Sequence, residues 1–316
     1  MLVLSGDDVR ELLDLDQLVD ALEAAMIELS AGTVSMPPRV AALVEERQAL
    51  LAAMPAYLPS ADALTTKLVS LFPENRDRPT HQALICCFDP STGTPVAVMD
   101  GEYITATRTA AGSALATRRL ARADAEVAAV IGTGVQAASH IRALARLSML
   151  RTFRLAGRDA SRVDTLAETM RAEGLPVEAA RSIEAAVREA DVVCAATHPA
   201  APVVLREWVR PGTHVNSVGY NSAGTGEVDG ALLRDARVVV ESRASVLAAP
   251  PSGAVEIQRA IDSGLITADA LVELGEVCAG TVPGRTSADE ITLYKSVGVA
   301  VQDAAAAALV LAAARD

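Results

Sequence analysis

Apolar and polar residues recur along the chain with two different periods. From residue 7 to 31 the apolar positions are three or four residues apart, and Gly32 follows as a stop signal, which predicts an opening helix. Residues 34–100 carry short apolar runs interrupted by Pro and Gly, with a turn signal at 89–93. We expect an antiparallel sheet in this region, with strands at 49–53, 64–71, 83–88 and 95–99.

Beyond an Ala-rich helix predicted at 102–122, strands and helices alternate. We expect strands at 126–131, 152–156, 192–195, 215–218 and 238–241, with helices at 134–148 and 161–173 between them. Such alternation is typical of βαβ units and a parallel sheet. The last apolar stretch, at about 287–315, predicts a helix whose apolar face needs a partner, and we expect it to return to the first domain.

The predicted fold class is therefore α/β. It combines a Rossmann-type parallel sheet domain with a second α+β domain whose sheet is partly antiparallel and which serves substrate binding and dimerisation. We expect the Rossmann domain at 119–294, and the second domain at 1–118 together with about 295–316.

Charge and composition narrow the function classes. The net charge is −12, from 28 basic against 40 acidic residues, so no general basic field attracts nucleic acid or an anionic membrane. Residues 1–30 carry no basic stretch followed by an apolar one, which predicts a cytoplasmic protein. The apolar run at 304–314 has about half of the ~20 residues needed to span a bilayer and predicts a buried packing helix.

The four cysteines, at 86, 87, 194 and 278, do not have the spacing of a metal or redox motif, and neither do the four histidines. We interpret the cysteines as small core residues and expect no metal site.

A glycine pattern follows the strand expected at 126–131. Gly132, Gly134 and Ala137 form Gly-x-Gly-x-x-Ala at the start of a helix. The first Gly permits the tight turn, the second lets the backbone approach a pyrophosphate, and the small third residue lets the helix pack on the strand. Free amides at the helix N-terminus then face the phosphates, so the sequence predicts a dinucleotide site.

The end of the second strand indicates which dinucleotide is bound. Gly157 occupies the position where NAD enzymes usually carry an acid for the ribose hydroxyls. Arg158 and Arg162, with Ser161 between them, form a set able to hold a 2′-phosphate, so we expect NADP(H) in preference to NAD(H). The alternative is that both arginines are solvated helix-start residues and that Asp159 is an N-cap or a displaced ribose ligand.

Segments along nearly the whole chain resemble the ornithine cyclodeaminase/mu-crystallin family. They are Met-Pro-Pro-Arg at 36–39, Met-Pro-Ala-Tyr at 54–57, Thr-Lys-Leu-Val-Ser at 66–70, Thr-Ala-Thr-Arg-Thr-Ala-Ala-Gly at 105–112, Val-Asn-Ser-Val-Gly at 215–219 and Gly-Thr-Val-Pro-Gly-Arg-Thr-Ser at 280–287. The resemblance implies a homodimer whose subunits act on amino or imino acids or bind small acids.

The resemblance also implies roles for single residues. Arg39, Lys67 and Arg108 converge on the substrate carboxylate facing the nicotinamide, with Lys67 and Arg108 as the catalytic pair and Met54 and Tyr57 as pocket wall. Two guanidinium groups and an ammonium leave a carboxylate little freedom, which presents one face of a C=N carbon to a hydride. Lys67 could in addition donate a proton to the substrate nitrogen, because the pKa of a lysine falls on burial near other cations.

Further candidates follow from the same resemblance. The predicted cofactor contacts are Gly132, Thr133, Gly134, Val135, Gln136, Gly157, Arg158, Ser161, Arg162, Thr197, Val218, Gly219 and Lys295. Ser287 and Glu290 have the spacing of a capping box at the start of the expected last helix.

One position departs from the family pattern. Cyclodeaminases carry an Asp shortly after the strand at 215–218, whereas this chain has Asn221, which can bind substrate but cannot take up a proton at neutral pH. Glu227 or Asp229 could replace the missing carboxylate.

Three functions stay open on this reading. The leading hypothesis is an NAD(P)H-dependent reductase of imino acids or ketimines, or an amino-acid dehydrogenase in reverse. The alternatives are an ornithine or lysine cyclodeaminase that uses NAD+ catalytically, and a mu-crystallin-like protein that binds NADPH and a small acidic ligand without reaction.

Overall fold

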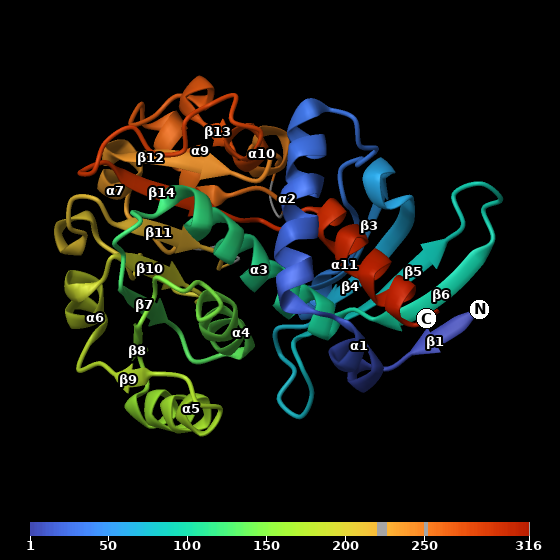
Figure 1. The fold of residues 1–316 in the computed structure, drawn as a ribbon, viewed down its shortest axis with the longest axis horizontal. Coiled ribbons are helices and arrows are strands. Elements are labelled where there is room, and N and C mark those ends of the chain that lie inside the picture. Colours follow the sequence, from blue (N-terminus) through green and yellow to red (C-terminus); the bar gives the residue numbers. More distant parts are fainter. Residues whose placement is uncertain (220–225, 250–251, 316) are drawn as a thin grey trace. The chain divides into compact units, whose positions relative to one another are not determined.

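The computed structural model describes residues 1–219, 226–249 and 252–315, and its contacts divide the chain into two compact units (Figure 1). One unit comprises Met1–Arg108 and Gly298–Asp316, and the other comprises Thr109–Val297. The boundary at Arg108 lies inside helix α3 (Glu102–Leu120), ten residues before the boundary expected from the sequence at 118. The predicted α/β fold class is confirmed, with one mixed sheet and one parallel sheet.

The first unit contains a six-stranded sheet with the order β1-β6-β5-β4-β3-β2. Neighbouring strands are antiparallel, except that β1 pairs with β6 in parallel. The strands are β1 (Leu2–Leu4), β2 (Val40–Val44), β3 (Ala49–Leu58), β4 (Ala63–Leu71), β5 (His81–Phe88) and β6 (Pro95–Asp100). Its helices are α1 (Gly6–Leu12), α2 (Leu15–Ala31) and α11 (Ala300–Ala313), with single 3-10 turns at Glu45–Arg47 and Pro59–Ala61.

The helical structure expected at 7–31, with its stop at Gly32, is confirmed, but the structure divides it into α1 and α2. Leu13 is extended, and the Asp14 side chain accepts a hydrogen bond from the Gln17 amide at 2.8 Å as the N-cap of α2. The apolar spacing continues across this break because both helices bury one face. An N-cap within a periodic stretch therefore starts a new helix where periodicity alone shows none.

The C-terminal segment corrects a second expectation, the helix at about 287–315. Residues Ile291–Lys295 form strand β14, and α11 begins only at Ala300. Ser287 and Glu290 do make capping contacts, since the Glu290 amide donates to Ser287 Oγ at 3.1 Å, but they close a turn and not a helix. The β-branched and aromatic residues of 291–295 suit a buried strand that pairs on both sides.

The second unit contains an eight-stranded, wholly parallel sheet with the order β13-β12-β14-β11-β10-β7-β8-β9. Its strands are β7 (Val127–Ile131), β8 (Thr152–Ala156), β9 (Val177–Ala179), β10 (Val192–Ala195), β11 (His214–Ser217), β12 (Ala236–Val240), β13 (Val272–Glu273) and β14. The strand order reverses between β7 and β10, and in such sheets ligands bind at the carboxyl ends of the strands beside this switch point.

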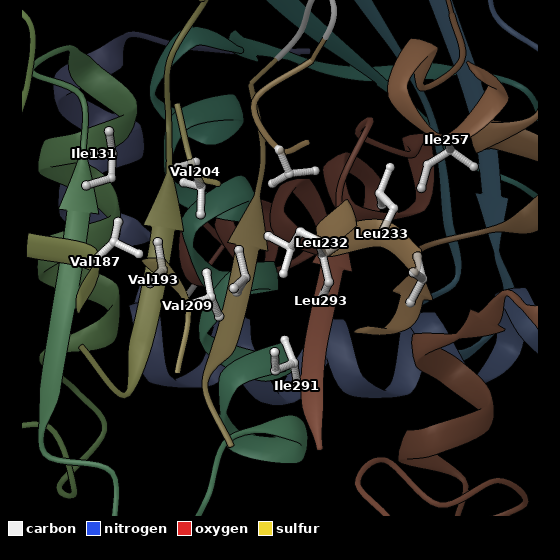
Figure 2. Packing of buried hydrophobic residues seen from close by; sticks show 14 of the residues in the cluster. Ile131, Val187, Val193, Val204, Val209, Leu232, Leu233, Ile257, Ile291 and Leu293 are labelled. Carbon is white, nitrogen blue, oxygen red and sulfur yellow. The ribbon is translucent and has the colours of Figure 1, made fainter. Parts of the chain in front are cut away.

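Helices and short turns join these strands. They are α4 (Val135–Leu144), α5 (Ala160–Ala172), α6 (Ile183–Glu189), α7 (Gly230–Asp235), α8 (Arg243–Val246), α9 (Val255–Asp262) and α10 (Leu274–Cys278), with 3-10 turns at Arg206–Trp208 and Ala268–Ala270. Figure 2 shows how strand residues such as Val193 and Leu293 pack with Leu233 of α7 in one core layer. β7 and β10 are apolar on both faces, as a doubly covered parallel sheet requires, whereas β11 carries the buried polar residues His214, Asn216 and Ser217.

A chain of buried polar side chains lies between α3 and the parallel sheet. Its members, in order, are Thr292, His214, Asn216, Thr117, Ser113 and His140, and Thr117 Oγ1 donates to the Ser113 backbone carbonyl. His140 Nδ1 donates to the Gln136 carbonyl at 2.7 Å, which leaves Nε2 as the acceptor for Ser113 Oγ at 3.0 Å. Burial lowers the pKa of His140 to about 4 and that of His214 to about 3, so both imidazoles are neutral at physiological pH.

These histidines are expected to make the fold labile to acid. Their pKa values in the folded protein lie below the unfolded value of about 6.5, so between pH 6.5 and about 4 the unfolded chain binds more protons. The free energy of unfolding should therefore fall as the pH drops from 7 to 5, by roughly 2 kcal/mol for each histidine. Urea unfolding at the two pH values measures this loss. His140→Gln should lose less stability than the wild type over the interval, and equal losses would contradict this account.

Candidate active site

The glycine loop after β7 has the geometry of a phosphate site. Gly132 has φ +126°, and a Cβ there would lie 2.5 Å from the Ala196 carbonyl oxygen, so only glycine fits. Gly134 is the N-cap of α4, and a Cβ there would meet nothing within 4 Å. Thr133 and Gln136 are half-buried and Val135 is exposed, so open space lies in front of the first turn of α4. Its free amides suit an anion.

The end of β8 lies beside this loop. A Cβ on Gly157 would lie 3.0 Å from Thr133 Cγ2 and 3.2 Å from Val163 Cγ2, which leaves little room for an acidic side chain. Asp159 is the N-cap of α5, because Oδ1 accepts from the Ser161 amide at 3.0 Å and from Ser161 Oγ at 2.7 Å. Arg158 and Arg162 are exposed on either side of this cap. The structure thus gives Asp159 the role of a helix cap, one of the two roles that the sequence allowed.

A buried carboxylate joins the ends of β10 and β11. Glu227 is fully buried and accepts hydrogen bonds from the Thr197 amide at 2.6 Å, Thr197 Oγ1 at 2.8 Å, Ser217 Oγ at 2.9 Å and the Gly219 amide at 2.7 Å. Both carboxylate oxygens are therefore occupied by donors of the chain. Asp229, the other carboxylate considered from the sequence, is the N-cap of α7 and accepts from the Leu232 amide at 3.0 Å.

Lys295 lies under the same strand ends. Its Nζ is 2.7 Å from Glu256 Oε1, and it donates to Ser217 Oγ at 3.3 Å and to the Gly219 carbonyl at 3.0 Å. Lys295 thus makes one ion pair and two hydrogen bonds. Lys295 therefore holds Gly219, a predicted cofactor contact. Val218 is held by its amide, which donates to the Ala195 carbonyl at 3.1 Å, and Asn221 lies outside the described residues.

Arg39, Lys67 and Arg108, the three cations expected to bind the substrate carboxylate, lie close together in the first unit. We call them the carboxylate clamp. Lys67 of β4 and Arg108 of α3 are buried, and the charges of Arg39 and Arg108 both act on Lys67. Arg39 is half-buried and its Nη2 donates to the Gly298 carbonyl at 2.8 Å. Met54 is buried opposite Lys67 in the β3–β4 register, whereas Tyr57 reaches Asp62 with its hydroxyl at 3.3 Å.

Two residues of α11 complete this clamp, and the sequence analysis missed both. Asp303 Oδ2 lies 2.8 Å from Lys67 Nζ, and Asp303 Oδ1 lies 3.1 Å from Arg108 Nε. Gln302 Oε1 accepts a hydrogen bond from Arg108 Nη1 at 2.7 Å. The available signal was a Gln-Asp pair inside the apolar stretch 299–314, where a buried polar residue needs a reason.

The ammonium of Lys67 is easier to deprotonate than that of an ordinary lysine. Burial lowers its pKa to about 8, and the positive charges of Arg108 and Arg39 act in the same direction, while Asp303 opposes them. The chain contains only two lysines, Lys67 and Lys295, among its 28 basic residues, and both are buried. Lysine, unlike arginine, can lose its proton in such a place, so the side chain at position 67 is chemically able to transfer a proton.

The remaining titratable side chains offer no second centre in the part of the chain that the structure describes. No group of three or more His, Cys, Asp and Glu among these residues could hold a metal ion. Burial raises the pKa of the Cys87 thiol to about 11, so it is not a thiolate at neutral pH. No helix within the described ranges is long and apolar enough to cross a membrane.

Comparison with known proteins shows to which family the chain belongs. The family model described as the ornithine cyclodeaminase/mu-crystallin family matches residues 1–316. The chain is 38% identical to the ketimine reductase mu-crystallin of Mus musculus over 313 residues, which cover 97% of this chain and 95% of that protein.

Solved structures also resemble the whole chain, and two of them illustrate this. The Delta(1)-pyrroline-2-carboxylate reductase of Thermococcus litoralis, in complex with NADH and L-proline, is 35% identical with a TM-score of 0.94, over 100% of this chain and 98% of that one. An archaeal alanine dehydrogenase dimer with bound NAD is 33% identical with a TM-score of 0.91, over 100% and 96% of the two chains.

Proposed function

Because the chain belongs to the ornithine cyclodeaminase/mu-crystallin family, we propose that it is a nicotinamide-dependent oxidoreductase that reduces the C=N bond of a carboxylate-bearing imino acid. The observation that carries this proposal is the cluster of buried Lys67 and Arg108 with half-buried Arg39, which offers three cations to one small anion. In the reduction, the imine carbon gains a hydride, its nitrogen gains a proton, and an amino acid leaves. The same enzyme run backward is an amino-acid dehydrogenase.

In the proposed reaction, different residues bind the cofactor, bind the substrate and transfer the proton. A nicotinamide cofactor, when bound, supplies or accepts the hydride. The glycine loop from Gly132 to Gly134 fits its pyrophosphate, since the loop presents amides and open space at the start of α4. Arg39 and Arg108 bind and orient the substrate carboxylate by charge-assisted hydrogen bonds. Lys67, with a pKa of about 8, holds the proton that the substrate nitrogen takes up.

The lyase alternative is weaker on these observations. Ring closure with loss of ammonia needs a carboxylate near the reacting nitrogen, and position 221 is Asn. Glu227 accepts four hydrogen bonds from the chain and Asp229 caps α7, so both carboxylates already serve the fold. A ligand-binding protein without catalysis has no need of a buried lysine with a lowered pKa, so the reductase is favoured over it as well.

The experiment that tests the proposal follows NADPH and NADH oxidation at 340 nm by the purified protein. The panel contains cyclic five- and six-membered ketimine carboxylates, and 2-oxo acids mixed with ammonia or methylamine. Turnover that is lost in Arg108→Ala supports the proposal. Release of ammonia from ornithine or lysine without net reduction, or binding of NADPH without any turnover, would instead establish the lyase or the binding protein.

We propose further that the cofactor is NADP(H). Position 157 has little room for the acid that binds ribose hydroxyls, and Arg158, Ser161 and Arg162 stand around the start of α5. The two solved relatives contain NADH and NAD, so this preference is a separate question from the reaction.

Arg158→Ala is expected to weaken NADPH binding by about 10- to 100-fold, because one charge-assisted hydrogen bond to a phosphate contributes roughly 1.5–3 kcal/mol. NADH binding should change little. Fluorescence titration with both cofactors measures the two affinities, and Arg188→Ala, which removes an arginine paired with Glu184 on α6, is the control. An equal loss for both cofactors would show that Arg158 does not contact a 2′-phosphate.

We also propose that the chain is a homodimer through the outer face of the six-stranded sheet. The strand register places Val40, Ala53, Leu68 and Leu84 in one row across β2 to β5. Val40 and Leu84 of this row are 66% and 50% exposed, and an apolar sheet face of this kind indicates a protein interface. The archaeal alanine dehydrogenase is described as a dimer. Light scattering should give twice the chain mass, and Leu84→Glu should halve it.

A further inference from the structure

A buried aspartate lies beneath the carboxylate clamp. Asp303 belongs to α11, and its side chain is 1% exposed. One carboxylate oxygen lies 2.8 Å from Lys67 Nζ of β4, and the other lies 3.1 Å from Arg108 Nε of α3. One carboxylate therefore connects the two residues to which the catalytic roles are assigned, and the two lie on separate elements.

The chain at and just before the start of α11 provides one hydrogen-bond acceptor for each arginine of the clamp. Gln302 accepts from Arg108 Nη1, and the Gly298 carbonyl, just before α11, accepts from Arg39 Nη2. Gly298 has φ +75°, and a Cβ there would lie 2.8 Å from Arg108 Nη2, so the backbone is shaped around this guanidinium. Gln302 and the Gly298 carbonyl are uncharged, whereas Asp303 carries a charge and contacts Lys67.

The charge balance gives Asp303 a second effect. The charged groups that act on Lys67 are Asp303 of α11, Arg108 of α3 and Arg39 before β2. Burial and the two arginines favour the neutral amine, whereas Asp303 is the charged group, among those of the described residues, that favours the ammonium. With three cations and one anion the clamp keeps an excess of positive charge, so a substrate carboxylate can bind without displacing Asp303.

We propose that Asp303 is a positioning residue of the reduction, which holds the ammonium of Lys67 and the guanidinium of Arg108 in one arrangement and keeps a proton on Lys67 at neutral pH. The proposal rests on the function proposed above for the part that concerns catalysis. Its chemical core, a carboxylate that sets the protonation of one buried amine, can be measured without any substrate.

The direct test is a titration of Lys67 by NMR in protein labelled with 13C-lysine. The chain has two lysines, so two Cε resonances appear, and Lys67→Arg assigns them. The wild type should titrate near pH 8, and Asp303→Asn should lower this midpoint by about 1 to 3 pH units, because loss of an adjacent opposite charge disfavours the ammonium. An unchanged midpoint in Asp303→Asn would overturn the proposal.

Two further variants separate charge from packing. Gln302→Leu removes the neighbouring acceptor of Arg108 but leaves Lys67 paired with Asp303, so it should raise KM while the Lys67 midpoint stays within about half a unit. Asp303→Glu keeps the charge in a displaced position and should retain a midpoint near 8 with a raised KM. Asp303→Ser, which also removes the charge and should lower the midpoint, replaces Asp303→Asn if that variant does not fold. A midpoint that moves as far in Gln302→Leu as in Asp303→Asn would assign the effect to packing and refute the proposal.

Activity measurements complete the test and distinguish the proposed role of Asp303 from the proposed reductase function. In Asp303→Asn the upper pH limit of kcat should move down with the NMR midpoint, and in Gln302→Leu it should not. If the NMR midpoints behave as expected but no imino acid is reduced by the wild type, the proposed function fails while the role of Asp303 in protonating Lys67 stands. If imines are reduced but the midpoint does not move in Asp303→Asn, the proposed function stands and the proposed role of Asp303 fails.

Discussion

Replacement of Lys67 by arginine is expected to lower kcat by about 100-fold or more while KM changes little, because general acid catalysis contributes typically 10²–10⁴-fold. Arginine retains the positive charge that pairs with Asp303 and attracts the substrate carboxylate. It does not release a proton at accessible pH, since a guanidinium has a far higher pKa than an ammonium. Steady-state kinetics of imine reduction measures both constants.

The matched variant Lys67→Met removes the charge as well as the proton, so it should raise KM in addition to lowering kcat. Thermal unfolding of both variants reports whether the buried site accepts the new side chain. A Lys67→Arg enzyme with nearly wild-type kcat would show that Lys67 serves only as a charge, and the proton would have to come from elsewhere.

The pH dependence of the two reaction directions should be opposite. In the proposed mechanism, reduction needs the ammonium of Lys67, whose pKa is about 8, so its rate should fall as the pH rises through 8. Oxidation of an amino acid needs the neutral amine and should become faster over the same interval. The rates of reduction and of oxidation are measured between pH 6 and 10 with one imino acid and its amino acid. If both rates rise, or both fall, as the pH passes 8, Lys67 is not the titrating group.

The second large effect is expected at Gly132. Gly132→Ala should abolish measurable dinucleotide binding and lower the free energy of unfolding by at least about 2 kcal/mol, because φ is +126° and the new Cβ would meet the Ala196 carbonyl at 2.5 Å. Gly134→Ala is the matched control. Its Cβ meets nothing within 4 Å, so stability should change by less than about 1 kcal/mol.

Dinucleotide binding should nevertheless weaken in Gly134→Ala, since the added methyl group would occupy the space through which a pyrophosphate approaches the amides of α4. NADPH fluorescence and urea unfolding measure the two properties. Wild-type affinity in Gly134→Ala would contradict the placement of the phosphates at this helix.

Local patterns were sufficient for much of the second unit. The strands expected at 152–156 and 192–195 have the bounds that the structure shows, and the α/β class is confirmed. β10 is a buried apolar run, and β8 alternates buried Phe153 and Leu155 with half-buried Thr152 and Arg154, and a window of a few residues reveals either pattern. The short strands β9 and β13, of three and two residues, were missed because such a length carries no period.

The C-terminal segment shows where local patterns are insufficient. The stretch 287–315 has a capping motif followed by apolar residues, and this pattern alone predicts a helix. The structure instead inserts β14 between β11 and β12, where its residues gain a ladder on each side. That gain depends on strands about 55 and 75 residues earlier in the chain, and long-range pairing then overrides local propensity.

The sequence by itself determined the glycine loop with its βαβ context, the family, and the three basic residues of the clamp, because each is carried by a short motif whose chemistry depends on neighbouring residues. Only the tertiary structure decided what these groups are paired with. Asp303 reaches Arg108 across 195 residues and Glu227 reaches Thr197 across 30. The protonation of Lys67 follows from its burial and from charges on three other segments, and such properties exist only once the chain is folded.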